Sequence, residues 1–126
     1  MSFPKNLVYN KDFSWIKISK GIATVGMIQE SVDNIKEIVL IDLPKKGQKI
    51  KLNETYVTIN SLKWSGDLSC PVEGEVVEVN DGLFDEPNLL NEDSYKNWIV
   101  KLTVETKESD LMSSEKAKKY YGDKIK

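Results

Sequence analysis

Short segments of alternating hydrophobic and polar residues recur along the whole chain. The first clear alternation places Ile16 and Ile18 on one face of a predicted strand and Lys17 on the other. The next alternating segment, residues 22–26, follows a Lys-Gly pair that is typical of a tight turn. The two segments are therefore predicted to form a β-hairpin.

Later segments repeat this pattern and predict a fold rich in strands. Ile50 and Leu52 are predicted to face the core from one strand, and Thr55, Val57 and Ile59 from the next. Proline and glycine residues separate several of these segments, as expected for turns. The remaining strands of this kind are predicted at residues 37–43, 75–79 and 98–104.

A helical period interrupts the alternation in the first half of the chain. Ile28, Val32 and Ile35 fall at positions i, i+4 and i+7, which predicts a helix of about two turns that covers one edge of the sheet. Residues 80–91 combine glycine and proline with several Asn and Asp residues. They are predicted to form a loop with a short helical turn at most.

The end of the chain is predicted to form a C-terminal helix over residues 113–121. Ser113 or Ser114 can cap its first turn, and Gly122 can end it. Six to eight short strands, with helices only at the edges, predict an all-β fold of the β-sandwich or flattened-barrel type. Because no interior linker is evident, residues 1–126 are predicted to form a single domain.

The amino-acid composition argues against several classes of function, among them enzymes and nucleic-acid-binding proteins. The 126 residues contain no histidine, which removes the commonest general base and metal ligand and lowers the expectation of an enzyme. All 18 basic residues are lysine and the net charge is −2, which argues against nucleic-acid binding. The single cysteine, Cys70, cannot form an internal disulfide and is interpreted as a small apolar core residue. With no long apolar run and no secretory signal, we expect a cytoplasmic protein that does not bind membranes.

Lys63 stands out by its position. One strand is predicted to run to Ser61 and a second to lead to Pro71, so that Lys63 lies in the turn between them. This places a lysine amine at the tip of a hairpin, clear of the body of the domain. A carrier protein needs such a placement, because the amine must reach a modifying enzyme and the attached group must then reach other active sites.

The sequence around Lys63 resembles that of the glycine cleavage H proteins, which are lipoyl carriers. The family pattern is approximately Val-Glu-Ser-Val-Lys-Ala-Ala-Ser-Asp-Ile-x-Ser-Pro-Val-x-Gly-x-Val, and it aligns here without a gap. Conservative replacements occupy three further positions, at Ile59, Leu62 and Leu68. The residues that match it are Ser61, Lys63, Asp67, Pro71, Val72, Gly74 and Val76.

The resemblance extends nearly from end to end. Residues 9–15 resemble the family's opening Tyr-x-x-x-His-Glu-Trp, and residues 24–26 its Val-Gly-Ile segment. Residues 38–47 resemble Ile-Val-x-Val-x-Leu-Pro-x-x-Gly. Residues 86–93, followed by Trp98, resemble Asn-Pro-x-Leu-Val-Asn-x-x-Pro-Tyr with a nearby tryptophan.

The resemblance implies a fold of the lipoyl-domain or barrel-sandwich hybrid type and a lipoate covalently attached to Lys63. It implies a monomeric carrier rather than an enzyme, modified by a lipoate ligase or lipoyltransferase. Its partners would be glycine decarboxylase, aminomethyltransferase and dihydrolipoyl dehydrogenase, between which it would shuttle an aminomethyl group and electrons. The hairpin residues expected to contribute to recognition are Asn60, Ser61, Leu62, Trp64 and Asp67.

Two departures lie beside Lys63 and leave alternatives open. The family's glutamate is Asn60, and the small residue after the lysine is Trp64, which can either be exposed for docking or fold back onto its own sheet. An alternative function is that of an H-like lipoate-binding protein that carries sulfur intermediates for heterodisulfide-reductase-like sulfur oxidation enzymes. A third possibility is an unmodified β-sandwich that mediates protein contacts.

Overall fold

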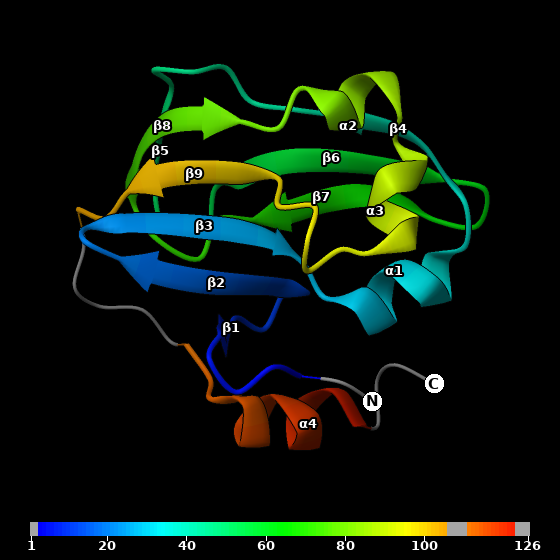
Figure 1. Cartoon of the computed structure of the whole chain (residues 1–126), viewed down its shortest axis with the longest axis horizontal. Coiled ribbons are helices and arrows are strands. Elements are labelled where there is room, and N and C mark those ends of the chain that lie inside the picture. The colour runs from blue at the N-terminus through cyan, green and yellow to red at the C-terminus, as the bar shows by residue number, and fades with distance from the viewer. Residues whose placement is uncertain (1–2, 106–110, 123–126) are drawn as a thin grey trace.

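Strand pairing arranges the chain in two antiparallel sheets, shown in Figure 1. The structure is a computed structural model and describes residues 3–105 and 111–122. The larger sheet has the order β1-β2-β3-β9-β8-β5, formed by β1 (Val8–Tyr9), β2 (Ser14–Ser19), β3 (Ile22–Met27), β9 (Val100–Thr103), β8 (Gly74–Val79) and β5 (Lys49–Ile50). The smaller sheet has the order β4-β6-β7, formed by β4 (Ile38–Asp42), β6 (Thr55–Ser61) and β7 (Ser65–Ser69). The predicted all-β fold is confirmed.

The two sheets share one hydrophobic core. Val25 and Val100 contribute from the larger sheet, and Ile41, Ile59 and Leu68 from the smaller one, all with no exposed side-chain area. Burial of this apolar surface is the main stabilising term for such a fold. The core therefore fixes the smaller sheet, which carries the Lys63 hairpin, against the rest of the protein.

The predicted hairpin at the start of the chain is present, but Ile18 does not face the core. β2 pairs with β3 throughout its length, and the turn residues Lys20 and Gly21 both have positive φ, at 52° and 78°. This conformation suits a two-residue hairpin turn. Ile16 is buried, whereas Ile18, on the same face of β2 but close to the hairpin turn, is 49% exposed.

Two further inward positions were predicted wrongly, for reasons of local geometry. Thr55 is exposed because the β6–β7 register shifts between Thr55 and Val57, and Tyr56 takes the buried position beside Val57. Leu52 is only half-buried, because β5 ends at Ile50 and the chain turns before Leu52. Alternation predicts a burial pattern only while the strand stays regular.

Short helices cover one side of the sandwich. α1 (Gln29–Ile35) confirms the predicted two-turn helix. The segment predicted as loop contains two helices, α2 (Gly82–Asp85) and α3 (Asn88–Glu92). Leu83 and Leu90 are fully buried, so each helix packs one leucine into the core although the local residues favour turns. None of the helices in the described part of the chain is long and apolar enough to cross a membrane.

The C-terminal helix α4 (Ser114–Gly122) closes a second hydrophobic cluster against β1 and β2. The Lys116 N–H donates to the Ser113 hydroxyl at 3.3 Å, which confirms serine capping. Tyr121 is fully buried; its hydroxyl donates to the Asn10 carbonyl at 2.6 Å and accepts the Phe13 N–H at 2.8 Å. These two bonds hold the loop between β1 and β2, in which Phe13 has a φ of 65°.

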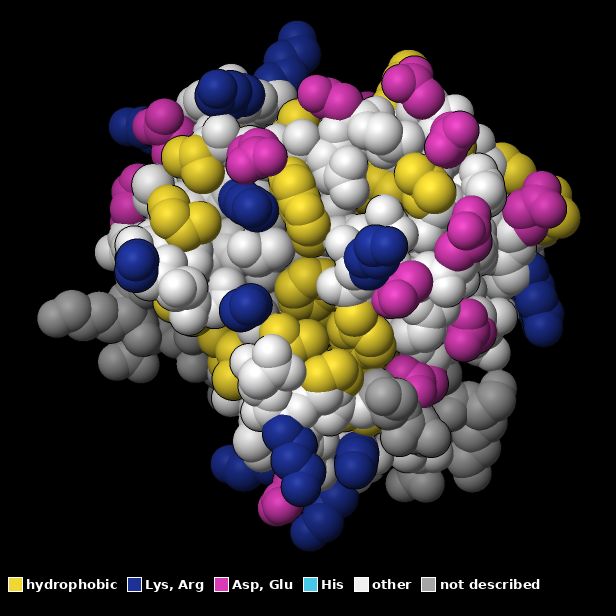
Figure 2. All heavy atoms as spheres, in the orientation of Figure 1, with side chains coloured by type: hydrophobic (Ala, Val, Ile, Leu, Met, Phe, Trp, Pro, Cys, Tyr) yellow, Lys and Arg dark blue, Asp and Glu magenta, His cyan; other side chains and the backbone are white. Residues whose placement is uncertain are grey.

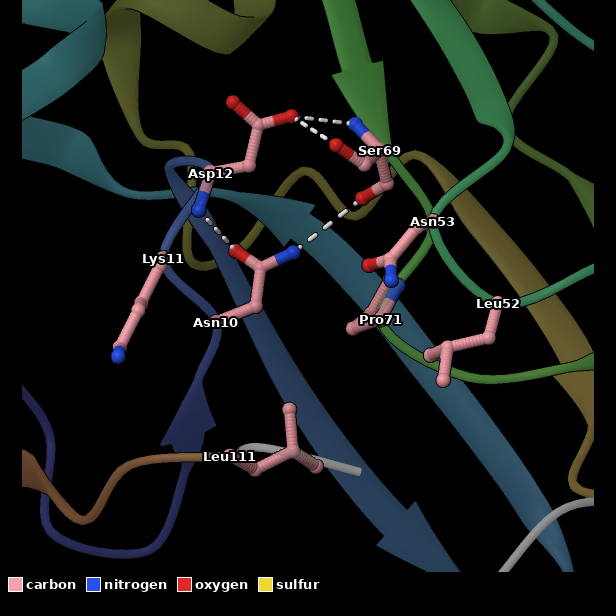
Figure 3. A pocket seen from close by; sticks show the side chains of 8 residues that line it. All are labelled: Asn10, Lys11, Asp12, Leu52, Asn53, Ser69, Pro71 and Leu111. Atoms are coloured by element: carbon pink, nitrogen blue, oxygen red, sulfur yellow. Dashed lines mark hydrogen bonds between the residues drawn. The ribbon is translucent and has the colours of Figure 1, made fainter. Parts of the chain in front are cut away.

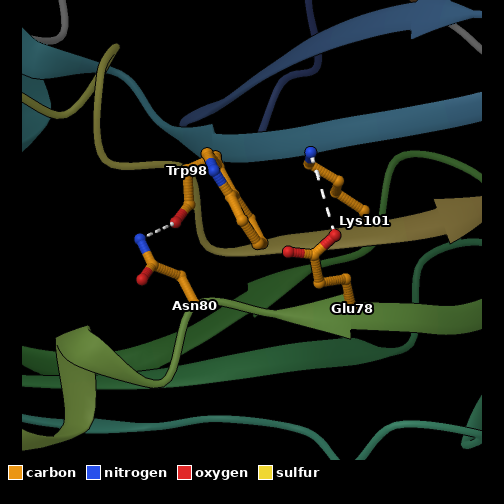
Figure 4. Close-up of polar contacts among 4 residues, drawn as sticks. All are labelled: Glu78, Asn80, Trp98 and Lys101. Atoms are coloured by element: carbon orange, nitrogen blue, oxygen red, sulfur yellow. Dashed lines mark hydrogen bonds and ion pairs between the residues drawn. The ribbon is translucent and has the colours of Figure 1, made fainter.

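Trp98 lies just before β9, an inner strand of the larger sheet, and its ring stands beside Lys101 (Figure 4). The Asn80 side-chain amide donates to the Trp98 carbonyl at 2.8 Å. The Lys101 ammonium lies 4.8 Å from the centroid of the Trp98 ring and 3.9 Å from a carboxylate oxygen of Glu78. Since Lys101 and Glu78 lie on paired strands, these contacts stabilise the β8–β9 pair.

Replacing Tyr121 with phenylalanine is expected to lower the free energy of unfolding by about 1–3 kcal/mol, because it leaves two backbone groups without partners. Urea unfolding followed by tryptophan fluorescence measures this change. Tyr9→Phe is a matched control, since the Tyr9 hydroxyl makes one such bond, to the Pro4 carbonyl at 2.6 Å. A loss no larger in Tyr121→Phe than in Tyr9→Phe would contradict the role given to the Tyr121 hydroxyl.

Candidate functional site: the Lys63 hairpin

The turn between β6 and β7 is held by one serine side chain. The Ser61 N–H donates to the Trp64 carbonyl at 2.8 Å, which leaves Leu62 and Lys63 as the two turn residues. The Ser61 hydroxyl donates to the same carbonyl at 2.9 Å and accepts the N–H groups of Trp64 at 2.9 Å and Lys63 at 3.3 Å. The hydroxyl thus bonds to the backbone on the far side of the turn and fixes its shape.

A second contact ties the turn to the neighbouring strand. The Leu62 N–H donates to the Glu37 carbonyl at 3.0 Å, just before β4 begins. The Leu62 side chain is 73% exposed, and Lys63 is exposed beside it. Sequence reasoning did not identify Glu37, because a backbone acceptor leaves no signature in side-chain type.

Lys63 has the geometry that a covalently attached group requires. Within residues 3–105 and 111–122, no ion pair or hydrogen bond involves its ammonium group. Its backbone is fixed by the Ser61 hydroxyl and, through Leu62, by β4. A free amine on a long flexible stem therefore projects from a rigid base. Lipoate attached here would enter solvent without displacing a structural contact.

Trp64 folds back onto its own hairpin. It is half-buried and packs against the main core. Its ring lies over Gly66, where a side-chain Cβ would come within 2.4 Å of a ring carbon. The family pattern quoted above has a small residue at position 64 and serine at position 66. Here position 64 holds a large residue and position 66 has no side chain, and the tryptophan occupies the space that a side chain at position 66 would fill.

The two remaining predicted residues lie on the outer face of the smaller sheet. Asn60 pairs with Ser65 across β6 and β7, and the Ser65 hydroxyl donates to the Asn60 side-chain oxygen. Asp67 pairs with Thr58, whose hydroxyl donates to the Asp67 carboxylate at 2.7 Å. The structure therefore places the predicted recognition residues on one hairpin, with Asn60 and Asp67 outward and Trp64 against the core.

The other end of β7 borders a polar hollow of about 320 Å³ (Figure 3). The Asp12 carboxylate accepts the Ser69 N–H at 2.6 Å and also the Ser69 hydroxyl. The Asn10 side-chain amide donates to the Ser69 carbonyl at 3.2 Å. The β1–β2 loop, held by Tyr121, is thus bonded to the strand that leads back to the hairpin. The opening family motif gave no signal for this contact, because Asn10 and Asp12 fall at its unspecified positions.

Cys70 follows β7 and is fully buried in the main core. Burial raises the pKa of its thiol to about 11, so the neutral form dominates at physiological pH. This supports the interpretation of Cys70 as a core residue rather than a nucleophile. In the described part of the chain, no group of three or more His, Cys, Asp or Glu side chains is arranged to hold a metal ion.

Comparison with known proteins identifies the family. The sequence profile of the family described as glycine cleavage H-protein matches residues 7–124. The chain belongs to this family. A probable glycine cleavage system H protein from Picrophilus torridus is 42% identical over 120 residues, covering 95% of this chain and 97% of the relative. A protein of the same description from Thermoplasma volcanium is 40% identical over 116 residues, covering 92% and 94%.

A solved structure agrees with the family at the level of the fold. The crystal structure of a glycine cleavage system H protein from Mycobacterium marinum matches with a TM-score of 0.86 and 26% identity, covering 96% of this chain and 98% of the other. The predicted resemblance is therefore confirmed across nearly the whole chain. The barrel-sandwich arrangement of the H-protein family accounts for the two sheets.

The close packing of the Trp64 ring over Gly66 predicts strong coupling between positions 64 and 66. Gly66→Ser is expected to lower the free energy of unfolding by about 1–3 kcal/mol, because the new side chain meets the Trp64 ring. In a Trp64→Ala background the same change should cost less than about 0.5 kcal/mol. Urea unfolding of the four proteins in this double-mutant cycle measures the coupling. An equal cost of Gly66→Ser in both backgrounds would show that the ring does not occupy this space.

The raised pKa of Cys70 predicts slow thiol labelling. At pH 8 a thiol of pKa about 11 is ionised in about one molecule in a thousand, against about one in four for a free thiol. Labelling with a disulfide reagent should therefore be at least about 100-fold slower in the native protein than in urea, and should accelerate as the pH approaches 11. Rapid native labelling at pH 8 would contradict the buried, neutral thiol.

Proposed function

We propose that this H-family protein carries lipoate on Lys63 and shuttles an aminomethyl group and electrons between the enzymes of glycine cleavage. The observation that carries the proposal is the free Lys63 amine on a turn fixed by Ser61, within a chain whose family match spans residues 7–124. When bound, lipoate supplies the dithiolane chemistry. The protein positions that group.

The residues of this chain have supporting roles in the proposed function. Ser61 holds the turn so that the stem of Lys63 is the first flexible element of the arm. Asn60, Leu62 and Asp67 are exposed or half-exposed around it and would be contacted by an enzyme that acts on the lysine. Trp64 closes the end of the core beneath the turn and supports the attachment point. No described residue acts as acid, base or nucleophile in this proposal.

The proposal also covers the partner enzymes, the oligomeric state and the cellular compartment. A lipoate ligase or lipoyltransferase would load it, and glycine decarboxylase, aminomethyltransferase and dihydrolipoyl dehydrogenase would use it. We propose that it acts as a monomeric, single-domain carrier in the cytoplasm rather than as an enzyme. The relatives named as glycine cleavage H proteins favour this pathway over sulfur oxidation.

Protein isolated from its native host after lipoate is supplied is expected to contain one lipoyl group, located on the peptide that carries Lys63. Intact mass and peptide mapping measure this directly. Lys63→Arg should lack the added mass while keeping the same unfolding midpoint, because the exposed Lys63 ammonium group makes no hydrogen bond or ion pair among the described residues.

Lys20 provides a matched control, since it is an exposed lysine in the two-residue turn of another hairpin. Lys20→Arg should be lipoylated to the same extent as the wild type. An unmodified Lys63 in cells whose other lipoyl proteins are loaded would contradict the proposal, and the unmodified interaction domain would then be the better account.

A further inference from the structure

Most of the large hydrophobic side chains left exposed lie on one side of the protein. Five such residues are exposed in the described part of the chain, and Ile18 is the one on the opposite hairpin. The other four gather near β4 and the Lys63 turn. They are Val39 at 49%, Leu40 at 42%, Leu62 at 73% and Phe84 at 59%. Isolated exposed hydrophobic residues are ordinary, but a contiguous group marks an interaction surface.

Strand pairing shows that the group is continuous with the lysine turn. Leu62 bonds through its N–H to Glu37, immediately before β4. Val39 and Leu40 follow on that edge strand, where a register shift between Ile38 and Leu40 turns both side chains outward. Leu40 pairs with Asn60, so its side chain lies beside the outer face of the hairpin.

The surface extends from β4 to α2. Asp42, two residues after Leu40, lines a hollow of about 380 Å³ together with Phe84 and Asp85. Leu62 lies beside the start of β4 and this hollow lies at its end. Because a strand rises only about 3.3 Å per residue, the five residues of β4 are short enough for one bound protein to cover both. We call the group of Val39, Leu40, Leu62 and Phe84 the β4 surface.

The charge around the β4 surface is mainly negative. Residues 33–42 and 81–93 carry eight exposed carboxylates and one lysine, Lys36. Figure 2 shows acidic side chains gathered along the side formed by α1, α2 and α3, with hydrophobic side chains between them. An apolar centre with a charged rim is the usual anatomy of a protein interface. A complementary partner would be basic at its rim and apolar at its centre.

We propose that the β4 surface is the docking site for the enzyme that attaches lipoate to Lys63, through an apolar patch with a basic rim on that enzyme. This inference rests on the proposed function. The enzyme that modifies the lysine must bring its active site to the ε-amine, so its contact area has to include the turn and the adjoining strand. Enzymes that use the loaded group meet it at the far end of a flexible arm and can bind elsewhere.

The acidic residues around the β4 surface supply the negative charge that Asn60 lacks. The family's glutamate beside the target lysine is absent here, and Asn60 is bonded to Ser65 instead. Carboxylates at Asp42 and Asp85 place negative charge farther along the same surface. Electrostatic attraction by such rim charges acts mainly on the rate of association and falls with salt.

The test is the rate at which the host's purified lipoate-attaching enzyme modifies the unlipoylated protein, read by intact mass. The double variant Leu40→Thr with Phe84→Ser should lower kcat/KM by about 10-fold or more, mainly through a higher KM, because two apolar contacts are lost. Ile18→Thr removes an equally exposed strand residue on the other hairpin and should stay within about two-fold of the wild type.

Charge is tested separately. Asp85→Asn should slow modification by about two- to three-fold at low salt and have no effect at high salt. Glu73→Gln is the control, since Glu73 is exposed and lies outside the two acidic stretches. Unfolding midpoints equal to the wild type confirm that each variant is folded.

The outcomes separate the two proposals. Wild-type protein that the enzyme fails to modify at Lys63 would contradict the proposed function itself. Normal modification of the wild type and of the Leu40→Thr, Phe84→Ser variant at equal rates would overturn only the docking site. A slower rate in that variant, with Ile18→Thr unchanged, supports it.

Discussion

The pairing of β6 with a strand on each side is the constraint on which the Lys63 turn depends. β6 is the central strand of the smaller sheet, and its buried residues Val57 and Ile59 anchor it in the core. Because both edges of β6 are hydrogen-bonded, the position of Ser61 at its end is fixed relative to the whole sandwich. The Ser61 hydroxyl then transmits this position across the turn, so that flexibility begins only at the Lys63 side chain.

The chemistry of the chain is consistent with this mechanical role. The one thiol is buried and neutral, histidine is absent, and the carboxylates of Asp12 and Asp67 accept structural hydrogen bonds. A carrier has to be inert toward the group that it bears, since any nearby nucleophile or base would compete with the partner enzymes. Polar side chains instead hold the loops in place. The Asp12 carboxylate accepts the Ser69 N–H, and the Tyr121 hydroxyl accepts the Phe13 N–H.

Trp64 shows how a site can change locally while the backbone is kept. A large ring next to Lys63 is accommodated by glycine two residues later on the same face of β7. The turn above keeps its hydrogen bonds. Because Trp64 turns inward, the surface that a partner meets is formed by the outward residues Leu62 and Leu40 rather than by the tryptophan.

The sequence by itself determined most of the strands, the hairpin and the lysine at its tip, but not β1, whose two residues are too few to show alternation. These features are local: alternation reports strands, and a lysine between two strands must lie in their turn. The family motif, matched without a gap from Ile59 to Val76, identified the same lysine independently. The C-terminal helix was also predictable within one residue, because its serine cap and glycine end are local signals.

Only the tertiary structure decided which faces of the strands and helices are covered by other elements. Ile18 alternates like a buried residue, yet it is exposed because no described strand or helix covers it, and the register shift in β4 turns Leu40 outward. The contact of Asp12 with Ser69 joins residues 57 positions apart, and the two helices in the segment 80–91 exist because Leu83 and Leu90 find room in the core. Burial depends on elements that are distant in the sequence, and local periodicity carries no information about where they pack.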